Sequence, residues 1–409
     1  MSLNRRLLIA VVIAIVFTGL IFRYAYRAPK RSYGDFRVYY AAGERFAAKE
    51  DIYQRHNPSI TPYKYSPMFA MLVSPLSLFS QKTASLLFFT LNFFAVLVIF
   101  VISKKIITKD KTSGGRNLLL YAITTICSMR FILHTLDSGQ VGILIMLLVV
   151  SGLYLLEKNR QTISASLISL SLMFKYTTVI FPAYFAFKKR RKLLMVVLAF
   201  IIFYCLLPAL HVGIEKDVEY VKNWIPFIAE HSLDKSSLYD YKNQSLYSFL
   251  LRLLTRDTPY TNNIANLTFS QGLIISLIIA GALFLLVITP GRGNDSERPL
   301  DYSLLLIMTA LLNPNAWMHN YVILIFAYML LLHCSINAGL KDKLTIALII
   351  VSFALTTLAG ELFVGDDLER LFEELSSTAI GGLILMFALL RLKWRRALPK
   401  DGVKAPPVL

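Results

Sequence analysis

A single carboxylate stands among aromatic side chains shortly after the first apolar run of the chain. Asp35 follows the apolar range 7–26 and opens a helical-looking run. A carboxylate in this place can cap the next helix, or it can take the proton of a hydroxyl group as a general base. Tyr39, Tyr40 and Tyr65 follow it, and their rings suit both sugar faces and the membrane interface. This setting favours Asp35 as the catalytic base.

Three cationic or hydrogen-bond-donating side chains could complement that base. Arg130, Lys175 and His319 each lie close to the end of an apolar segment. Charged groups at membrane depth are costly unless they face a cavity or a partner, which makes each of them a candidate for function. The alternative is that Arg130 and Lys175 extend to lipid headgroups and that the histidine is a packed interface residue. The functional interpretation predicts that all three bind a phosphate group.

Further polar and aromatic residues are predicted to lie on the same side of the membrane as Asp35 and to bind substrate. They are Tyr39, Tyr40, Tyr65, His134, Gln140, Asn243, Gln244 and Trp317. His211, Glu215, Asp217 and Glu219 lie near one another in the chain, but their spacing fits no metal-ligand pattern. We therefore expect no metal site.

The positioning elements must be membrane helices. Of the 409 residues, 56% are hydrophobic and only 17% are charged, a composition typical of membrane proteins. The net charge of +18 is attributed to cytoplasmic Lys and Arg facing anionic headgroups, not to nucleic acid. The three cysteines lie in separate apolar runs, which favours packed thiols over disulfides or a metal cluster.

Basic segments such as Lys188–Lys192 mark cytoplasmic ends. With these segments inside, the chain makes one all-α membrane domain over 1–409, with about twelve helices and both termini cytoplasmic. Two long extracytoplasmic loops result, 27–83 with Asp35 and 211–267, the second expected on the acceptor side. The predicted spans are 7–26, 84–102, 117–134, 139–156, two short helices within 162–187, 193–210, 268–289, 300–313, 320–334, 344–359 and 376–391.

Several short segments of the chain resemble glycosyltransferase family 87. The segments are Asp35 to Ala42, Tyr65-Ser66-Pro67, Gly139-Gln140, Lys175 within Met-Phe-Lys-Tyr-Thr, Asn243 to Leu246 with Arg252, and Leu312 to Tyr321. The chain departs from the family pattern at Ser66, where a proline is usual, and at Asn320, where a second histidine is usual. The resemblance implies a GT-C type fold and a mannosyltransferase that uses polyprenyl-phosphate mannose.

The resulting prediction is a cell-membrane enzyme that moves a sugar, by resemblance mannose, from a polyprenyl-phosphate donor to a hydroxyl of a lipid or glycan acceptor. Asp35 is the base, and the single carboxylate favours inversion by direct displacement. Arg130, Lys175 and His319 hold the leaving phosphate. No cofactor is expected, since the lipid-linked sugar is a co-substrate; membrane lipids are the other partners. The alternatives are a transporter or flippase for an anionic or lipid-linked substrate, and a non-catalytic assembly protein.

Overall fold

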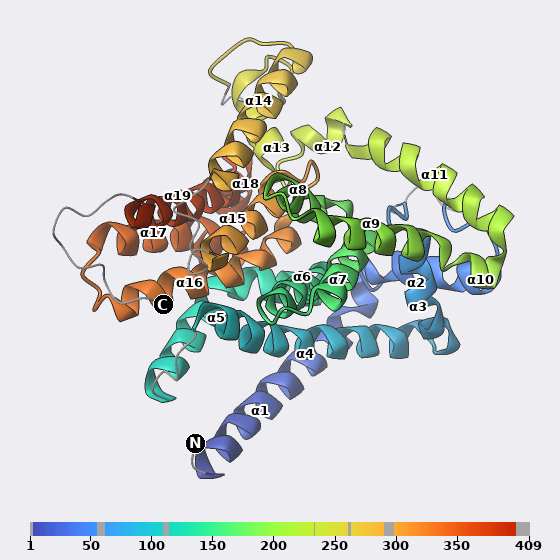
Figure 1. Cartoon of the computed structure of the whole chain (residues 1–409), viewed down its shortest axis with the longest axis horizontal. Helices are drawn as coiled ribbons and strands as arrows, with labels where there is room; N and C mark the ends of the chain where they lie inside the picture. Colours follow the sequence, from blue (N-terminus) through green and yellow to red (C-terminus); the bar gives the residue numbers. More distant parts are fainter. Residues whose placement is uncertain are drawn as a thin grey trace.

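The computed structural model describes residues 3–54, 62–108, 114–232, 234–260, 263–289 and 298–397. Helices dominate these ranges (Figure 1), and extended pairing within them is limited to one bridge between Thr255 and Leu267. The all-α prediction is confirmed.

Among the described residues, six helical segments are long and apolar enough to cross a membrane. They are α4 (Gln81–Ile107), Arg116–Ser138 of α5 (Gly114–Ser138), α9 (Arg191–Leu206) with α10 (Ala209–Val212), α14 (Phe269–Ile288), η5 (Met318–Ile323) with α16 (Leu324–Asn337), and Ser377–Arg395 of α19 (Ser377–Ala397). A helix pair bent by 85° could make a seventh span. It joins α17 (Lys343–Phe353) and η6 (Ala354–Leu358) to α18 (Glu361–Glu374).

The prediction of twelve spans is not confirmed. The predicted ranges do form helices, but several are shorter than a full crossing requires. The short ones are α6 (Gly142–Glu157), α7 (Gln161–Phe174), α8 (Ile180–Phe187) and α15 (Arg298–Leu311). The first predicted span is α1 (Leu3–Arg27), which extends from the other helices toward the N-terminus (Figure 1).

Burial separates the central helices from the peripheral ones. The η5–α16 segment is 78% buried, whereas the α9–α10 segment is 22% and α14 is 28% buried. The two peripheral segments expose apolar side chains such as Ile202 and Ile278. Apolar side chains can remain exposed at low cost only where lipid or another apolar partner covers them, which agrees with a membrane protein.

The two predicted long loops are largely helical. The first contains η1 (Pro29–Arg31), α2 (Phe36–Ala47), α3 (Pro67–Val73) and η2 (Ser74–Leu78). The second contains α11 (Ile214–Ser232), α12 (Lys235–Tyr239) and α13 (Leu246–Leu254).

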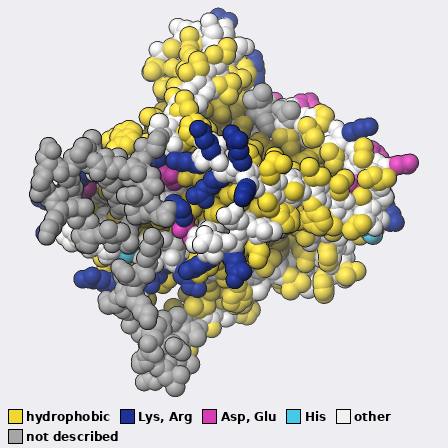
Figure 2. Space-filling model, viewed as in Figure 1, with side chains coloured by type: hydrophobic (Ala, Val, Ile, Leu, Met, Phe, Trp, Pro, Cys, Tyr) yellow, Lys and Arg dark blue, Asp and Glu magenta, His cyan; other side chains and the backbone are white. Residues whose placement is uncertain are grey.

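Basic residues gather on one face, around the adjoining ends of α8, α15 and α19. Figure 2 shows Lys and Arg side chains grouped on a face that is otherwise rich in hydrophobic side chains. Lys393, with a side chain only 1% exposed, lies 2.8 Å from Asp301, and Lys188 lies 3.8 Å from the same carboxyl group. Tyr184 donates a 2.8 Å hydrogen bond to Asp301. Buried charges are tolerated only when paired in this way.

Candidate active site

A cavity of about 590 Å³ brings together most of the residues that the sequence predicts for the site. Those in its lining are Asp35, Tyr39, Tyr65, His134, Gln140, Lys175, Trp317 and His319. They come from α2, α5, the segment before α3, and the breaks before α6, after α7 and at η5. Pockets of this size are usual for binding small substrates.

Two glycines let the segment with Asp35 approach the turn after α5. Gly34 and Gly139 both have positive φ, and a Cβ on Gly34 would lie 2.5 Å from the carbonyl oxygen of Ser138. The backbone N–H of Asp35 donates a 2.9 Å hydrogen bond to that same carbonyl. Glycine adopts such backbone angles without strain, and its lack of a Cβ leaves room for this contact. The close approach sets Asp35 beside Gln140.

Asp35 occupies the N-cap position of α2, yet its side chain makes no capping hydrogen bond. The carboxylate instead accepts a hydrogen bond from the amide of Gln140. The capping interpretation of Asp35 is therefore wrong. Burial raises the pKa of this carboxyl group above its usual value, while the bond from Gln140 and the ammonium group of Lys175 partly offset the rise.

Two tyrosines extend this network. The hydroxyl of Tyr39 donates a 3.0 Å hydrogen bond to the side-chain oxygen of Gln140, and it lies 2.8 Å from the hydroxyl of Tyr65. The two rings meet edge to face at 4.9 Å. Gln140 thus accepts from Tyr39 and donates to Asp35, which fixes the orientation of its amide.

Lys175 lies at the break between α7 and the short helix η3 (Tyr176–Val179). Its ammonium group donates a 2.6 Å hydrogen bond to the side-chain oxygen of Asn320. Ser66 stabilises this break, because its hydroxyl donates to the Met173 carbonyl at 2.6 Å and also caps α3. The serine that departs from the family pattern therefore joins α3 to the segment just before Lys175.

His319 lies next to Asn320 in η5, and its ring stacks on that of His134 with centroids 6.2 Å apart. We call Asp35, Gln140, Lys175 and His319 the mixed wall of the cavity, because it combines a carboxylate with cationic and neutral donors. A substrate in contact with this wall could lose a proton at one point and have negative charge stabilised at another.

A second part of the lining is acidic and belongs to α18. Glu361, Glu369 and Glu373, which we call the acidic wall, all line the cavity. Arg130 anchors this helix: its guanidinium lies 2.6 Å from Glu369 and 3.5 Å from Glu373, and it donates to the Thr356 carbonyl at 2.8 Å. The Arg130 side chain also packs on Gly360, where a Cβ would lie 2.7 Å from its Nε.

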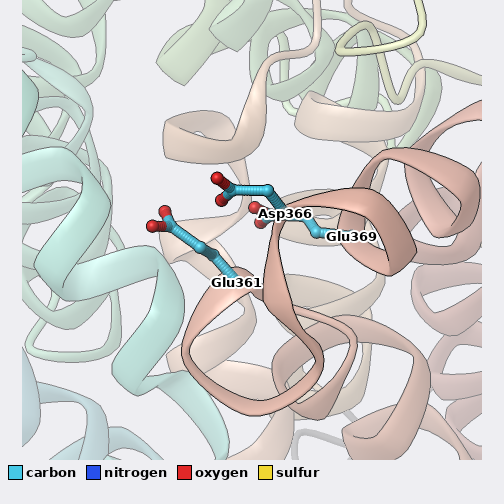
Figure 3. A group of neighbouring side chains, drawn as sticks. All are labelled: Glu361, Asp366 and Glu369. Atoms are coloured by element: carbon cyan, nitrogen blue, oxygen red, sulfur yellow. The ribbon is translucent and has the colours of Figure 1, made fainter.

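Figure 3 shows Glu361, Asp366 and Glu369 converging at the edge of α18. Their carboxylate oxygens lie within 4.8 Å of one another, so the group could hold a metal ion. Glu361 and Asp366 are exposed, and Glu369 is already paired with Arg130. The carboxylates around Asp217 in α11, whose spacing fits no metal-ligand pattern, are not part of this group.

Four predicted site residues do not line the cavity. Arg130 is engaged by α18, and the hydroxyl of Tyr40 donates to the Phe79 carbonyl at 2.8 Å. Asn243 and Gln244 are fully buried. Asn243 bonds the Pro314 carbonyl and the Ala316 backbone N–H, and Gln244 bonds the Glu373 carbonyl. These two residues therefore support the backbone behind both walls.

Sequence reasoning did not select the carboxylates of α18, Asn320 as a contact of Lys175, or the pocket residues Lys64 and Trp224. A signal for α18 was present, since this helix has six acidic residues and one arginine in a chain of net charge +18. No local pattern indicated the Asn320 contact, because the two residues are 145 positions apart.

The fold and the cavity define a multi-helix membrane protein with a polar, mixed-charge binding site. A family model for glycosyltransferase family 87 matches residues 63–314. The chain belongs to this family, and the resemblance seen in its sequence is thereby confirmed. No curated protein and no solved structure matches the chain. The matched range contains Tyr65, His134, Gln140 and Lys175, whereas Asp35 lies before it, and His319 and α18 lie after it.

Proposed function

We propose that this family 87 glycosyltransferase transfers a sugar from a polyprenyl-phosphate donor to a hydroxyl of a lipid or glycan acceptor on the extracytoplasmic side of the cell membrane. Mannose is the proposed sugar, by resemblance to the family. The observation that carries the proposal is the mixed wall, in which a largely buried carboxylate shares one cavity with Lys175 and His319. No cofactor takes part in the proposed reaction.

The chemistry follows from the groups in this wall. The acceptor oxygen forms a bond to the anomeric carbon of the donor sugar while its proton passes to Asp35. The bond between that carbon and the phosphate oxygen breaks, and the polyprenyl phosphate leaves with the bonding electrons. Lys175 and His319 stabilise the negative charge on the leaving phosphate. Direct displacement of this kind inverts the configuration at the anomeric carbon.

The arrangement of α15 and α19 supports the extracytoplasmic side. α15 begins at Arg298 near the basic face and ends just before Asn313, which lines the cavity. α19 runs the other way, from Thr378 near Gln244 to Lys393 in the basic cluster. The cavity and the basic face thus lie at different ends of the same helices. Basic residues favour the cytoplasm, and this supports our proposal that the cavity opens on the other side.

The test uses purified full-length protein in liposomes with radiolabelled polyprenyl-phosphate mannose and a lipid extract as the acceptor source. Label transfer is compared between the wild type, Asp35→Asn and the matched control Asp257→Asn. Asp257 is a half-exposed carboxylate outside the cavity lining. We expect Asp35→Asn to reduce the rate by about 100-fold or more, and Asp257→Asn to leave it unchanged.

Transfer that survives in Asp35→Asn would remove this residue as the base but keep the enzyme. Failure of the wild type with mannose, glucose and arabinose donors on polyprenyl phosphate would overturn the proposed donor class. Movement of intact labelled donor across the bilayer, with no glycosidic product, would establish the transporter alternative.

A further inference from the structure

The side chain of Asn320 joins the two groups that we assign to the leaving phosphate. Its oxygen accepts the 2.6 Å hydrogen bond from the Lys175 ammonium group, and its nitrogen lies 3.2 Å from Nε2 of His319. That nitrogen also donates to the backbone carbonyls of Trp317 at 3.1 Å and Asn315 at 3.3 Å. One amide thus contacts both Lys175 and His319.

These neighbours determine which end of the amide is oxygen. A lysine ammonium group donates hydrogen bonds and accepts none, so the atom facing Lys175 must be the amide oxygen. The two backbone carbonyls accept hydrogen bonds and donate none, so the atom facing them must be the amide nitrogen. The contacts at both ends therefore require the same orientation of the Asn320 side chain.

The orientation of Asn320 in turn determines the protonation of His319. The amide nitrogen has two hydrogens for three neighbours, so one hydrogen is shared between Nε2 and a backbone carbonyl. Because this nitrogen donates and does not accept, the His319 Nε2 atom that faces it offers a lone pair. A proton on Nε2 would place two donors against each other. His319 is therefore a neutral imidazole whose proton is on Nδ1.

We propose that Asn320 is a positioning residue that holds Lys175 in place and keeps His319 as the neutral, Nδ1-protonated tautomer, so that His319 binds the leaving phosphate as a neutral donor. The first part, the tautomer, stands on the contacts alone. The second part, the role toward the phosphate, rests on the proposed function. Two donors with fixed directions stabilise developing charge without reorganising during the reaction.

The chain offers a matched control for this arrangement. Asn337 contacts Nε2 of His333 at 3.0 Å, at the far end of α16 and outside the cavity lining. An Asn→Asp change at either position replaces a donor with an acceptor and so favours a proton on the facing Nε2 atom. Only the change at Asn320 alters a residue next to the proposed phosphate site.

The experiment is ¹⁵N NMR of full-length protein labelled at histidine, at neutral pH, because protonated and unprotonated ring nitrogens have well-separated shifts. The His319 signals are assigned by their loss in His319→Gln. We expect an unprotonated Nε2 and a protonated Nδ1 in the wild type, and a protonated Nε2 in Asn320→Asp. Asn337→Asp should change the His333 signals alone. A wild-type His319 that is protonated at Nε2, or a tautomer that does not respond to Asn320→Asp, would overturn the first part.

The transfer assay tests the second part. We expect Asn320→Asp to lower kcat by about tenfold or more, with a smaller change in KM for the donor, because the lost interaction strengthens only as the phosphate leaves. Asn337→Asp should transfer at the wild-type rate. An unchanged kcat in Asn320→Asp would remove the role toward the phosphate. Absence of transfer by the wild type with every lipid-phosphate sugar would instead count against the proposed function, and the NMR result would still decide the tautomer.

Discussion

The mixed wall and the acidic wall of the cavity are built in different ways. In the mixed wall, side chains from distant parts of the chain bond directly to one another, as Asp35 does to Gln140 and Lys175 to Asn320. In the acidic wall, the carboxylates belong to one helix, and the residue that holds them, Arg130, lies outside the lining. The first arrangement fixes the individual groups to which we assign the chemistry, whereas the second fixes a helix. The comparison predicts that substitutions in the mixed wall change the rate of transfer and that substitutions around α18 change stability.

The largest effect on rate, after that of Asp35→Asn, is expected at Lys175. Lys175→Met keeps the length of the side chain but removes the charge that faces the phosphate, and should lower kcat by about 100-fold or more. Steady-state transfer in liposomes measures this change. Lys235→Met, in α12 and outside the lining, is the control. A wild-type kcat in Lys175→Met would show that the charge of Lys175 does not contribute to transfer. The predicted difference between the two walls would then be wrong.

At Arg130 we expect a large loss of stability. Arg130→Gln removes the partner that Glu369 and Glu373 share, and both carboxylates are largely buried. Because unpaired buried charges are costly, the substitution should lower the free energy of unfolding by about 3 kcal/mol. Thermal unfolding in detergent, followed by tryptophan fluorescence, measures the loss.

The control for this prediction is the triple variant with Arg130→Gln, Glu369→Gln and Glu373→Gln. It removes the unpaired charges and should recover part of the lost stability. A stable Arg130→Gln protein with a strongly reduced kcat would show that Arg130 acts on substrate, as its sequence position suggested.

The pH dependence of kcat/KM should reflect the protonation of Asp35. Its folded pKa is raised by burial, and a general base works only when deprotonated, so kcat/KM should fall as the pH drops through that raised pKa. Gln140→Leu removes a hydrogen bond that lowers the pKa. The acidic limb of the variant should therefore lie at higher pH. A profile of log(kcat/KM) against pH for both proteins measures the shift, and identical limbs would mean that another group controls the rate.

The smallest effect is expected in the outer part of α18. Glu361 and Asp366 are exposed, so Glu361→Gln with Asp366→Asn should change transfer by less than about threefold and stability by less than about 0.5 kcal/mol. Transfer is measured with and without a chelator. A tenfold loss that a chelator reproduces in the wild type would make the group of Glu361, Asp366 and Glu369 a metal site and give it a direct role in the reaction.

Part of this molecule could be predicted from the sequence because the signals are local. Apolar runs and basic segments identified a helical membrane protein, and short motifs indicated the family that the family model confirms. Most of the predicted site residues also line one cavity, because charged and aromatic side chains near the ends of apolar helices have few other places to lie. The number of full crossings is not confirmed, since helices such as α7 and α15 are shorter than a full crossing requires.

Tertiary contacts decided what each of these side chains does. Nothing near Asp35 in the sequence distinguishes a capping side chain from one that bonds a distant residue; the glycine-mediated approach to Gln140 does. Likewise, Arg130 and Lys175 are both cations near the end of an apolar segment. Arg130 is paired with carboxylates of α18, whereas Lys175 lines the cavity. The sequence by itself determined the membrane class, the family and part of the set of residues that line the cavity, because hydrophobic length and residue type act over one helix. Partner choice depends on which distant segments meet, and only the packing of the helices determines that.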